Sequence, residues 1–106
     1  MKQYHFGDVL VAEFSFPSGA GSKVRPAVVI LDAGDDDVLC AILTSQLRST
    51  VYDISITQWK AAKLELPSVV RMHKMFTIRK SRVIKKLGRI QNTDLNQLKL
   101  VFHSLI

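Results

Sequence analysis

The chain has little of the chemistry that cross-links proteins or binds metals. It contains one cysteine, three prolines and five glycines in 106 residues. A single cysteine excludes an intramolecular disulfide and a cysteine-based metal site within the chain. Cys40 lies inside an apolar run, so we expect a reduced thiol in the core. The three histidines have no ligand spacing, and there is no phosphate-loop or dinucleotide-binding motif. We therefore expect neither a metal nor a cofactor.

Long apolar segments are also absent. The longest apolar runs, Ala27–Leu31 and Val38–Leu43, fall far short of the ~20 residues that span a bilayer. The segment Met1–His5 lacks the apolar region of a signal peptide. We therefore expect a cytoplasmic protein with no membrane partner. With 47% apolar residues, the 106-residue chain is long enough for one domain with a real core, spanning residues 1–106.

Acidic residues are scarce in the second part of the chain. Residues 1–40 carry three basic and six acidic residues, whereas residues 41–106 carry twelve basic and three acidic ones. From Arg71 to Arg89 there are eight basic residues and no acidic one. This asymmetry favours a polyanionic partner, either a nucleic acid or an acidic protein tail. The alternative is a solvated basic face that only aids solubility.

Short apolar and alternating segments predict a mainly β fold. Strands are expected at residues 8–14, 25–31, 38–44, 51–56 and 68–78, with residues 83–90 open between strand and helix. Short helical turns are expected at residues 58–64 and 79–82, and a loop at residues 16–22. These elements predict five to six strands in a small curled, barrel-like sheet.

The last segment predicts a C-terminal α-helix. Asn92 or Thr93 suits the N-cap, and Asp94 suits the first turn. An apolar stripe at spacings of three and four follows, made of Leu95, Leu98, Val101, Phe102 and Leu105. We expect this helix to cover one opening or edge of the sheet.

Arg25 is the first candidate for a functional residue. It stands at the mouth of an apolar strand, after Lys23 and directly before Pro26, which is tolerated where a strand begins. An arginine offers five donors in a planar fork and stays charged, which suits phosphate recognition. The alternative is an arginine that only decorates a loop.

Two further groups follow in the sequence. Thr44, Ser45 and Gln46 end the third expected strand and could hydrogen-bond a phosphate or a 2′-hydroxyl; an ordinary strand-terminating turn is the alternative. In the fifth expected strand, Arg71 and His73 share one face and Lys74 the other. A cation beside a group that titrates near neutrality has the parts for acid–base work on a phosphodiester, although a lone histidine is more often structural.

The order of these motifs resembles the MazF/PemK family of toxins over nearly the whole chain. The resemblance rests on the segments Gly7–Ala12, Pro17 to Gly19 and Lys23–Ile30, then on Ala41–Gln46, Ser68–Arg71 with Thr77–Ile78, and the C-terminal helix. It implies an SH3-like, partly open barrel that forms a homodimer. It also implies a toxin that cuts single-stranded RNA, such as mRNA, at short sequences. Cleavage would need no metal, would proceed by 2′-hydroxyl attack and would leave a 2′,3′-cyclic phosphate. A cognate antitoxin with an acidic tail would inhibit it.

The resemblance also assigns roles to residues. The family's catalytic arginine falls on Arg25, its catalytic threonine or serine on Thr44, and a later-strand arginine on Arg71. His73 stands where several members have an aspartate, so we expect it to act as the acid or base. The loop before Arg25 lacks the acidic residue that many members carry. The expected RNA-binding residues are Lys23, Ser45, Gln46, Arg71, Lys74 and Arg79.

Two other functions fit the same sequence. One is a non-catalytic RNA-binding barrel that has lost its activity. The other is a related toxin that, like the gyrase-poisoning toxins of similar structure, acts on a protein target. Such a toxin would not need Arg25 and Thr44 together, so their presence argues against it.

Overall fold

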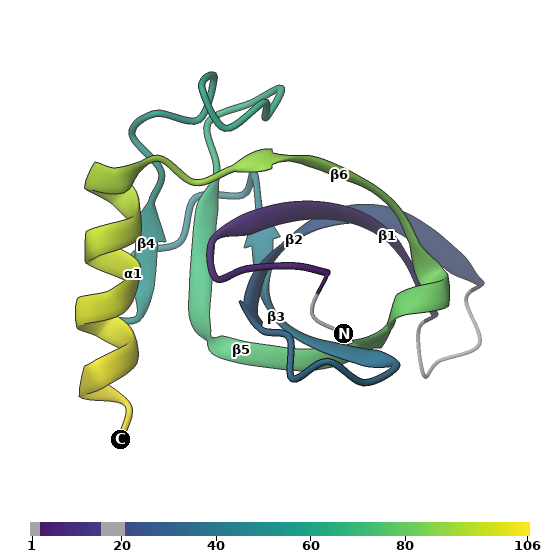
Figure 1. The fold of residues 1–106 in the computed structure, drawn as a ribbon. Helices are drawn as coiled ribbons and strands as arrows, with labels where there is room; N and C mark the ends of the chain where they lie inside the picture. Colours follow the sequence, from purple (N-terminus) through teal and green to yellow (C-terminus); the bar gives the residue numbers. More distant parts are fainter. Residues whose placement is uncertain (1–2, 16–20) are drawn as a thin grey trace.

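The structure is a computed structural model that describes residues 3–15 and 21–106. Six antiparallel strands form one sheet in the order β4-β5-β3-β2-β1-β6. The elements are β1 (Asp8–Ser15), β2 (Ser22–Leu31), β3 (Asp37–Thr44), β4 (Asp53–Ser55), β5 (Val69–Arg79), the 3₁₀ turn η1 (Lys80–Arg82), β6 (Val83–Arg89) and α1 (Asn92–Ser104). The sheet curls into a partly open barrel, with α1 beside β4 and β5 (Figure 1). The predicted fold class is confirmed. Residues 16–20 of the predicted loop lie outside the described residues.

Both faces of the central strands are buried. Side chains alternate along a strand, so neighbours such as Val9 and Leu10 enter different clusters. Val9 belongs to the helix-side core, which includes Val28, Leu43, Val70, Met72, Leu95 and Leu98. Leu10 belongs to the second core, which includes Ala12, Ala27, Val29, Val38, Cys40 and Ile78. Two buried faces explain why these strands read as continuous apolar runs.

Cys40 is a free thiol in the second core, as predicted. Burial raises its pKa to about 12, because the thiolate would be desolvated. The thiol is therefore chemically inert at neutral pH.

The helix begins where the sequence predicts, but a different residue occupies the N-cap position. Gln91 occupies the N-cap, and no side chain caps the helix, so the prediction of Asn92 or Thr93 was wrong. The carboxylate of Asp94 instead accepts hydrogen bonds from the backbone N–H of Thr57 (3.1 Å), the Thr57 hydroxyl (2.8 Å) and the backbone N–H of Gln58 (2.9 Å). Asp94 is buried and needs donors, and the segment after β4 supplies them. The first turn of α1 is thus tied to the sheet.

Two predicted strands differ from the structure. The strand expected at residues 25–31 begins earlier, at Ser22, so Arg25 and Pro26 lie within β2. The strand expected at residues 51–56 is reduced to β4, because Thr50 donates to the Asp53 carboxylate and Tyr52 donates to the Thr50 hydroxyl, which makes a turn.

The short helical turn expected at residues 58–64 is present as a series of turns, in which the N–H of Ala62 donates to the carbonyl of Gln58. The turns end at Lys63, which has a φ of 70°.

The last two expected elements are resolved by the structure. Residues 80–82 form the 3₁₀ turn, and the segment open between strand and helix is β6. Gly88 allows β6 to approach the turns after β4, since a Cβ at this position would lie 2.3 Å from the carbonyl oxygen of Ala62. No helix among residues 3–15 and 21–106 is long and apolar enough to cross a membrane.

Buried carboxylates join the acidic and basic halves of the chain. Asp32 contacts the Lys80 ammonium at 2.8 Å and accepts backbone hydrogen bonds from Gln3, Tyr4 and Gly34. Burial alone would raise the pKa of Asp32, but these donors, led by Lys80, hold it well below its usual range. The buried Asp8 receives Lys86 Nζ and Arg89 Nη1, each at 3.2 Å.

The Asp94 anchor predicts a loss of stability on truncation. Asp94→Ala should lower the free energy of unfolding by about 2–3 kcal/mol, because the hydrogen bonds of Thr57 and Gln58 to a buried, charged carboxylate are lost. Urea unfolding followed by circular dichroism measures the change. Asp36→Ala is the control, since Asp36 is exposed. Equal stability of the two variants would contradict the anchoring role.

Candidate functional site

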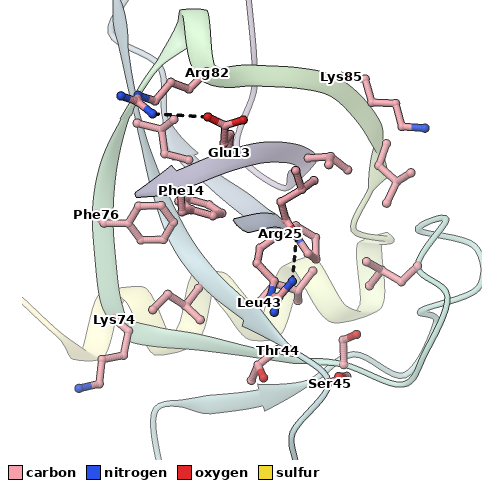
Figure 2. Close-up of a pocket in the computed structure, with 18 of the residues that line it drawn as sticks. Glu13, Phe14, Arg25, Leu43, Thr44, Ser45, Lys74, Phe76, Arg82 and Lys85 are labelled. Atoms are coloured by element: carbon pink, nitrogen blue, oxygen red, sulfur yellow. Dashed lines mark hydrogen bonds and ion pairs between the residues drawn. The ribbon is translucent and has the colours of Figure 1, made fainter. Parts of the chain in front are cut away.

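A groove of about 1380 Å³ opens at one end of the second core. It is lined from β1, β2, β3, β5 and β6 and from the segment before β5. The lining includes the side chains of Glu13, Phe14, Arg25, Ile42, Thr44, Ser45, Gln46, Lys74, Phe76, Arg79, Arg82 and Lys85. Several of them point into the opening in Figure 2.

Strand register brings Arg25 and Thr44 together. β2 pairs with β3 so that Ala27 lies opposite Ile42. Two residues further along each strand, the same register sets Arg25 opposite Thr44, on the face that carries the second core. The Arg25 side chain extends toward the end of β3, where Thr44 and Ser45 lie (Figure 2). Arg25 is exposed, and its Nη1 donates to the carbonyl of Val24 at 3.0 Å.

The hydroxyl of Thr44 is oriented by the turn that follows it. Its Oγ1 accepts a hydrogen bond from the backbone N–H of Gln46 at 3.1 Å. One lone pair is therefore occupied, while the hydroxyl proton keeps its freedom to donate. Thr44 is thus set up as a hydrogen-bond donor beside a guanidinium, an arrangement that suits a phosphate oxygen.

Apolar and aromatic side chains line the rest of the groove. Phe14 and Phe76 meet edge to face, with ring centroids 5.1 Å apart and planes at 75°. Both rings pack against the second core. β1 and β5 are not neighbours in the sheet order, so this contact exists only because the sheet curls. Sequence reasoning missed the two rings, since their proximity has no local signal.

The eight basic residues between Arg71 and Arg89 divide into two groups. Lys74, Arg79, Arg82 and Lys85 line the groove. The other four, Arg71, Lys80, Lys86 and Arg89, bind the carboxylates of Asp53, Asp32 and Asp8.

The four cations of this segment that line the groove differ in their ion pairs. Arg82 lies 3.9 Å from Glu13, and Arg79 lies 3.9 Å from Asp37. Both pairs are largely exposed and contribute little to stability. Lys74 and Lys85 have no ion pair within the part of the chain that the structure describes, and they lie on opposite sides of the opening (Figure 2). Sequence reasoning missed Lys85 and Arg82; alternation along β6 could have placed Lys85.

Arg71 and His73 lie outside the lining of the groove. Arg71 Nε donates to Asp53 Oδ1 at 2.9 Å, and Arg71 Nη2 lies 3.4 Å from His73 Nε2. The centroids of the His73 and Tyr52 rings lie 5.4 Å apart, and His73 Nδ1 is buried with no hydrogen-bond partner among the described residues. Burial opposes ionisation of Asp53, but Arg71 and Thr50 outweigh it and lower the pKa of that carboxyl.

The groove therefore gathers some of the predicted site residues and leaves others apart. It is lined by Arg25, Thr44, Ser45, Gln46, Lys74 and Arg79. Lys23 is exposed on β2 and does not line it, and Arg71 and His73 form the separate cluster with Asp53. The acid–base role of His73 stays a prediction. Among the described residues, no three His, Cys, Asp or Glu side chains are grouped so that they could hold a metal ion.

Comparison with known proteins shows one family. The family model described as "PemK-like, MazF-like toxin of type II toxin-antitoxin system" matches residues 5–106. No curated protein matches the chain.

Solved structures share the fold at low identity. A Mycobacterium tuberculosis toxin, MazF-mt6, is 17% identical with a TM-score of 0.75, over 92% of this chain and 93% of that one. A mycobacterial endoribonuclease in complex with its cognate antitoxin is 14% identical with a TM-score of 0.79, over 96% and 93%. The MazE–MazF structure (Form-II) from Deinococcus radiodurans is 16% identical with a TM-score of 0.77, over 96% and 94%.

The pairing of Arg71 with Asp53 predicts a pH-dependent stability difference. Asp53 has a lowered pKa, so its charge stabilises the folded state above about pH 4, and this contribution fades as the pH falls through the lowered pKa. Arg71→Met should cost about 3 kcal/mol at pH 7 because it leaves a buried carboxylate unpaired. Urea unfolding should show this difference narrowing below about pH 4.

Lys74→Met is the matched control, because Lys74 has no carboxylate partner among the described residues. The free energy of unfolding of Lys74→Met should equal that of the wild type at every pH. A difference between Arg71→Met and the wild type that stays constant down to pH 2 would remove Asp53 from this linkage.

Proposed function

The chain belongs to the PemK-like, MazF-like toxins of type II toxin–antitoxin systems, and we propose that it is a metal-independent endoribonuclease that cleaves single-stranded RNA in the cytoplasm at selected sequences. The observation that carries the proposal is the strand register that sets Arg25 level with Thr44, in a groove lined by five further cations, Lys63, Lys74, Arg79, Arg82 and Lys85. Solved structures of the same fold include proteins named as endoribonucleases, which supports the reaction class.

The proposed reaction uses the RNA's own nucleophile. The 2′-oxygen attacks the neighbouring phosphorus while the bond to the 5′-oxygen breaks, which leaves a 2′,3′-cyclic phosphate and a 5′-hydroxyl. One proton leaves the 2′-hydroxyl for a base, and one is delivered to the 5′-oxygen. Negative charge grows on the non-bridging phosphate oxygens in the transition state, where fixed donors act best.

Arg25 and Thr44 suit the electrostatic part of this reaction. The Arg25 fork can contact two phosphate oxygens at once, and the free hydroxyl proton of Thr44 can serve one of them. His73 keeps its predicted role as acid or base. Because it lies outside the groove with Arg71 and Tyr52, its role must be tested separately from that of Arg25.

The proposal includes two protein partners. One is a cognate antitoxin whose acidic segment covers the cationic groove. A similar structure holds a cognate antitoxin, and Lys74 and Lys85 offer cations to such a segment. The other is a second copy of the chain, which the family resemblance implies as a homodimer.

Loss of Arg25 should slow RNA cleavage far more than it weakens RNA binding. Arg25→Ala should lower the rate of RNA cleavage in the presence of a chelator by roughly 10²–10³-fold, because one donor to the transition-state charge is removed. Single-turnover cleavage of synthetic RNA measures the rate, and Lys99→Ala on the outer helix is the control. RNA binding without cleavage by the wild type would favour the non-catalytic barrel. Neither activity, together with growth arrest, would favour a toxin that acts on a protein.

The same assay tests His73. If His73 is the acid or base, His73→Ala should slow cleavage far more than it weakens RNA binding, and the pH–rate profile should lose one limb. The Arg71 contact and overall stability are checked on the same preparation by urea unfolding. A wild-type rate in His73→Ala would remove this residue from the mechanism.

Salt dependence tests the cationic lining. If Lys74 and Lys85 contact phosphates, their joint replacement by alanine should reduce the slope of log affinity against log salt by about 1.4, since each contact on single-stranded RNA contributes about 0.7. Fluorescence anisotropy with a non-cleavable 2′-O-methyl RNA gives the slope. Lys86→Ala is the matched control from β6, because Lys86 is bound to Asp8. An unchanged slope in the double variant would place the RNA elsewhere.

A further inference from the structure

The segment between β3 and β4 is exposed but anchored at both ends. Every residue from Ser45 to Tyr52 is exposed. At its start, the N–H of Gln46 donates to Thr44 Oγ1. At its end, the N–H and hydroxyl of Thr50 donate to Asp53 Oδ2, at 3.0 and 2.8 Å, while Arg71 holds the other oxygen. Such a segment presents its side chains without the ordering cost of a free loop.

Two side chains of this segment orient one another. Arg48 Nη2 donates to Gln46 Oε1 at 2.9 Å. The bond occupies one of the two lone pairs of Gln46 Oε1 and directs the Gln46 NH₂ group away from Arg48. The remaining groups of the pair are the Gln46 NH₂ and the other N–H groups of Arg48, which are donors, and the second lone pair of Gln46 Oε1. Donors therefore outnumber acceptors on the pair.

The donor array lies next to the proposed site of cleavage. Gln46 lines the groove, and its backbone N–H donates to the hydroxyl of Thr44. Thr44 is the residue proposed to donate a hydrogen bond to the phosphate. Arg48 does not line the groove but is bonded to Gln46, so a base beside a phosphate held by Arg25 and Thr44 would meet Gln46 first and Arg48 through it.

We propose that Gln46 and Arg48 read a base beside the cleaved phosphate, and that they select guanine or uracil over adenine and cytosine. The inference rests on the proposed function, because it requires RNA in the groove. Guanine presents O6 and N7 as acceptors, and uracil presents O4. Adenine and cytosine carry an amino group in place of that keto oxygen, so a donor of the base would face a donor of the pair, and adenine retains N7 as its single acceptor on this edge. Discrimination therefore arises both from good pairs with the keto bases and from unsatisfied donors with the amino bases.

The test compares base preference in the wild type and in variants of the pair. Substrates are RNA oligonucleotides randomised on both sides of the cleavage point, together with 2′-O-methyl versions that cannot be cleaved. The wild type should favour guanine or uracil at one position by about tenfold to a hundredfold. If guanine is preferred, 7-deazaguanine should lose the preference because it lacks N7, and inosine should keep it.

Two variants make opposite changes. Arg48→Ala should flatten the preference at that position, because it removes donors and frees the Gln46 amide to turn. Gln46→Glu keeps the bond to Arg48 but replaces the outward NH₂ by an acceptor, so the preference should shift toward cytosine or adenine. Ser49→Ala, in the same exposed segment, is the control and should retain the wild-type preference.

The two readouts separate this inference from the proposed function. If the wild type binds the 2′-O-methyl substrates with a keto-base preference that Arg48→Ala removes, base reading is supported even where no RNA is cleaved. If the wild type cleaves RNA with a preference that none of these variants changes, cleavage stands and the inference is overturned. Equal binding and cleavage of all four bases would also overturn it.

Discussion

The antiparallel register between β2 and β3 is the constraint on which the candidate site depends. A shift of one residue would move Arg25 to the other face of the sheet and away from Thr44. The register is held by buried pairs further along the strands, such as Val28 with Ala41 and Val29 with Cys40. Because both faces of these strands are buried, a slip would misplace apolar side chains on both sides. The core therefore fixes the polar groups at the rim.

Ion pairing divides the positive charge of the chain between structure and surface. Asp8, Asp32 and Asp53 each have a buried carboxylate, and all three find their cations in or beside β5 and β6. These pairs fasten elements that are distant in the sequence, such as the N-terminal segment and η1. The cations left in the groove are therefore those with exposed partners or none among the described residues. A sequence count of charge alone overstates the positive surface, since it cannot separate the two groups.

Much of the fold follows from local patterns. Alternation and apolar runs predict β1, β2, β3, β5 and the helix, because these elements bury apolar side chains, whereas β6 has no buried residue and could not be told from a helix. The errors have two causes. Asp94 does not cap its own helix, because its carboxylate accepts hydrogen bonds from Thr57 and Gln58, which are 37 and 36 residues away in the sequence, and this contact has no local signal. β4 is short because of a local turn, in which Thr50 donates to the carboxylate of Asp53.

Local patterns also predict part of the candidate site, and they miss what depends on the curvature of the sheet. Thr44 could be placed from the end of its strand and Lys74 from alternation, and both line the groove. Arg25 lines it too, although it lies within β2 and not at the predicted start of the strand. His73 shares a face with Arg71, as alternation requires, but that face belongs to the Asp53 cluster and not to the groove. Proximity of two residues in a basic segment does not show which side of a curled sheet they reach. The contact between Phe14 and Phe76 depends on the same curvature, so it too is invisible until the sheet is closed.

The rigid part of the groove and its exposed segment suit different parts of a nucleotide. A phosphate is the same in every nucleotide, so its ligands can be set by the sheet, as Arg25 and Thr44 are. A base differs from one nucleotide to the next, so its ligands are better placed on a surface segment that can change without disturbing the core. The segment after Thr44 meets both demands. Its ends are hydrogen-bonded to groups of β3 and β4, while the side chains of Gln46 and Arg48 are exposed and hydrogen-bonded to each other. Substitutions there should alter which RNA is bound at little expense to folding.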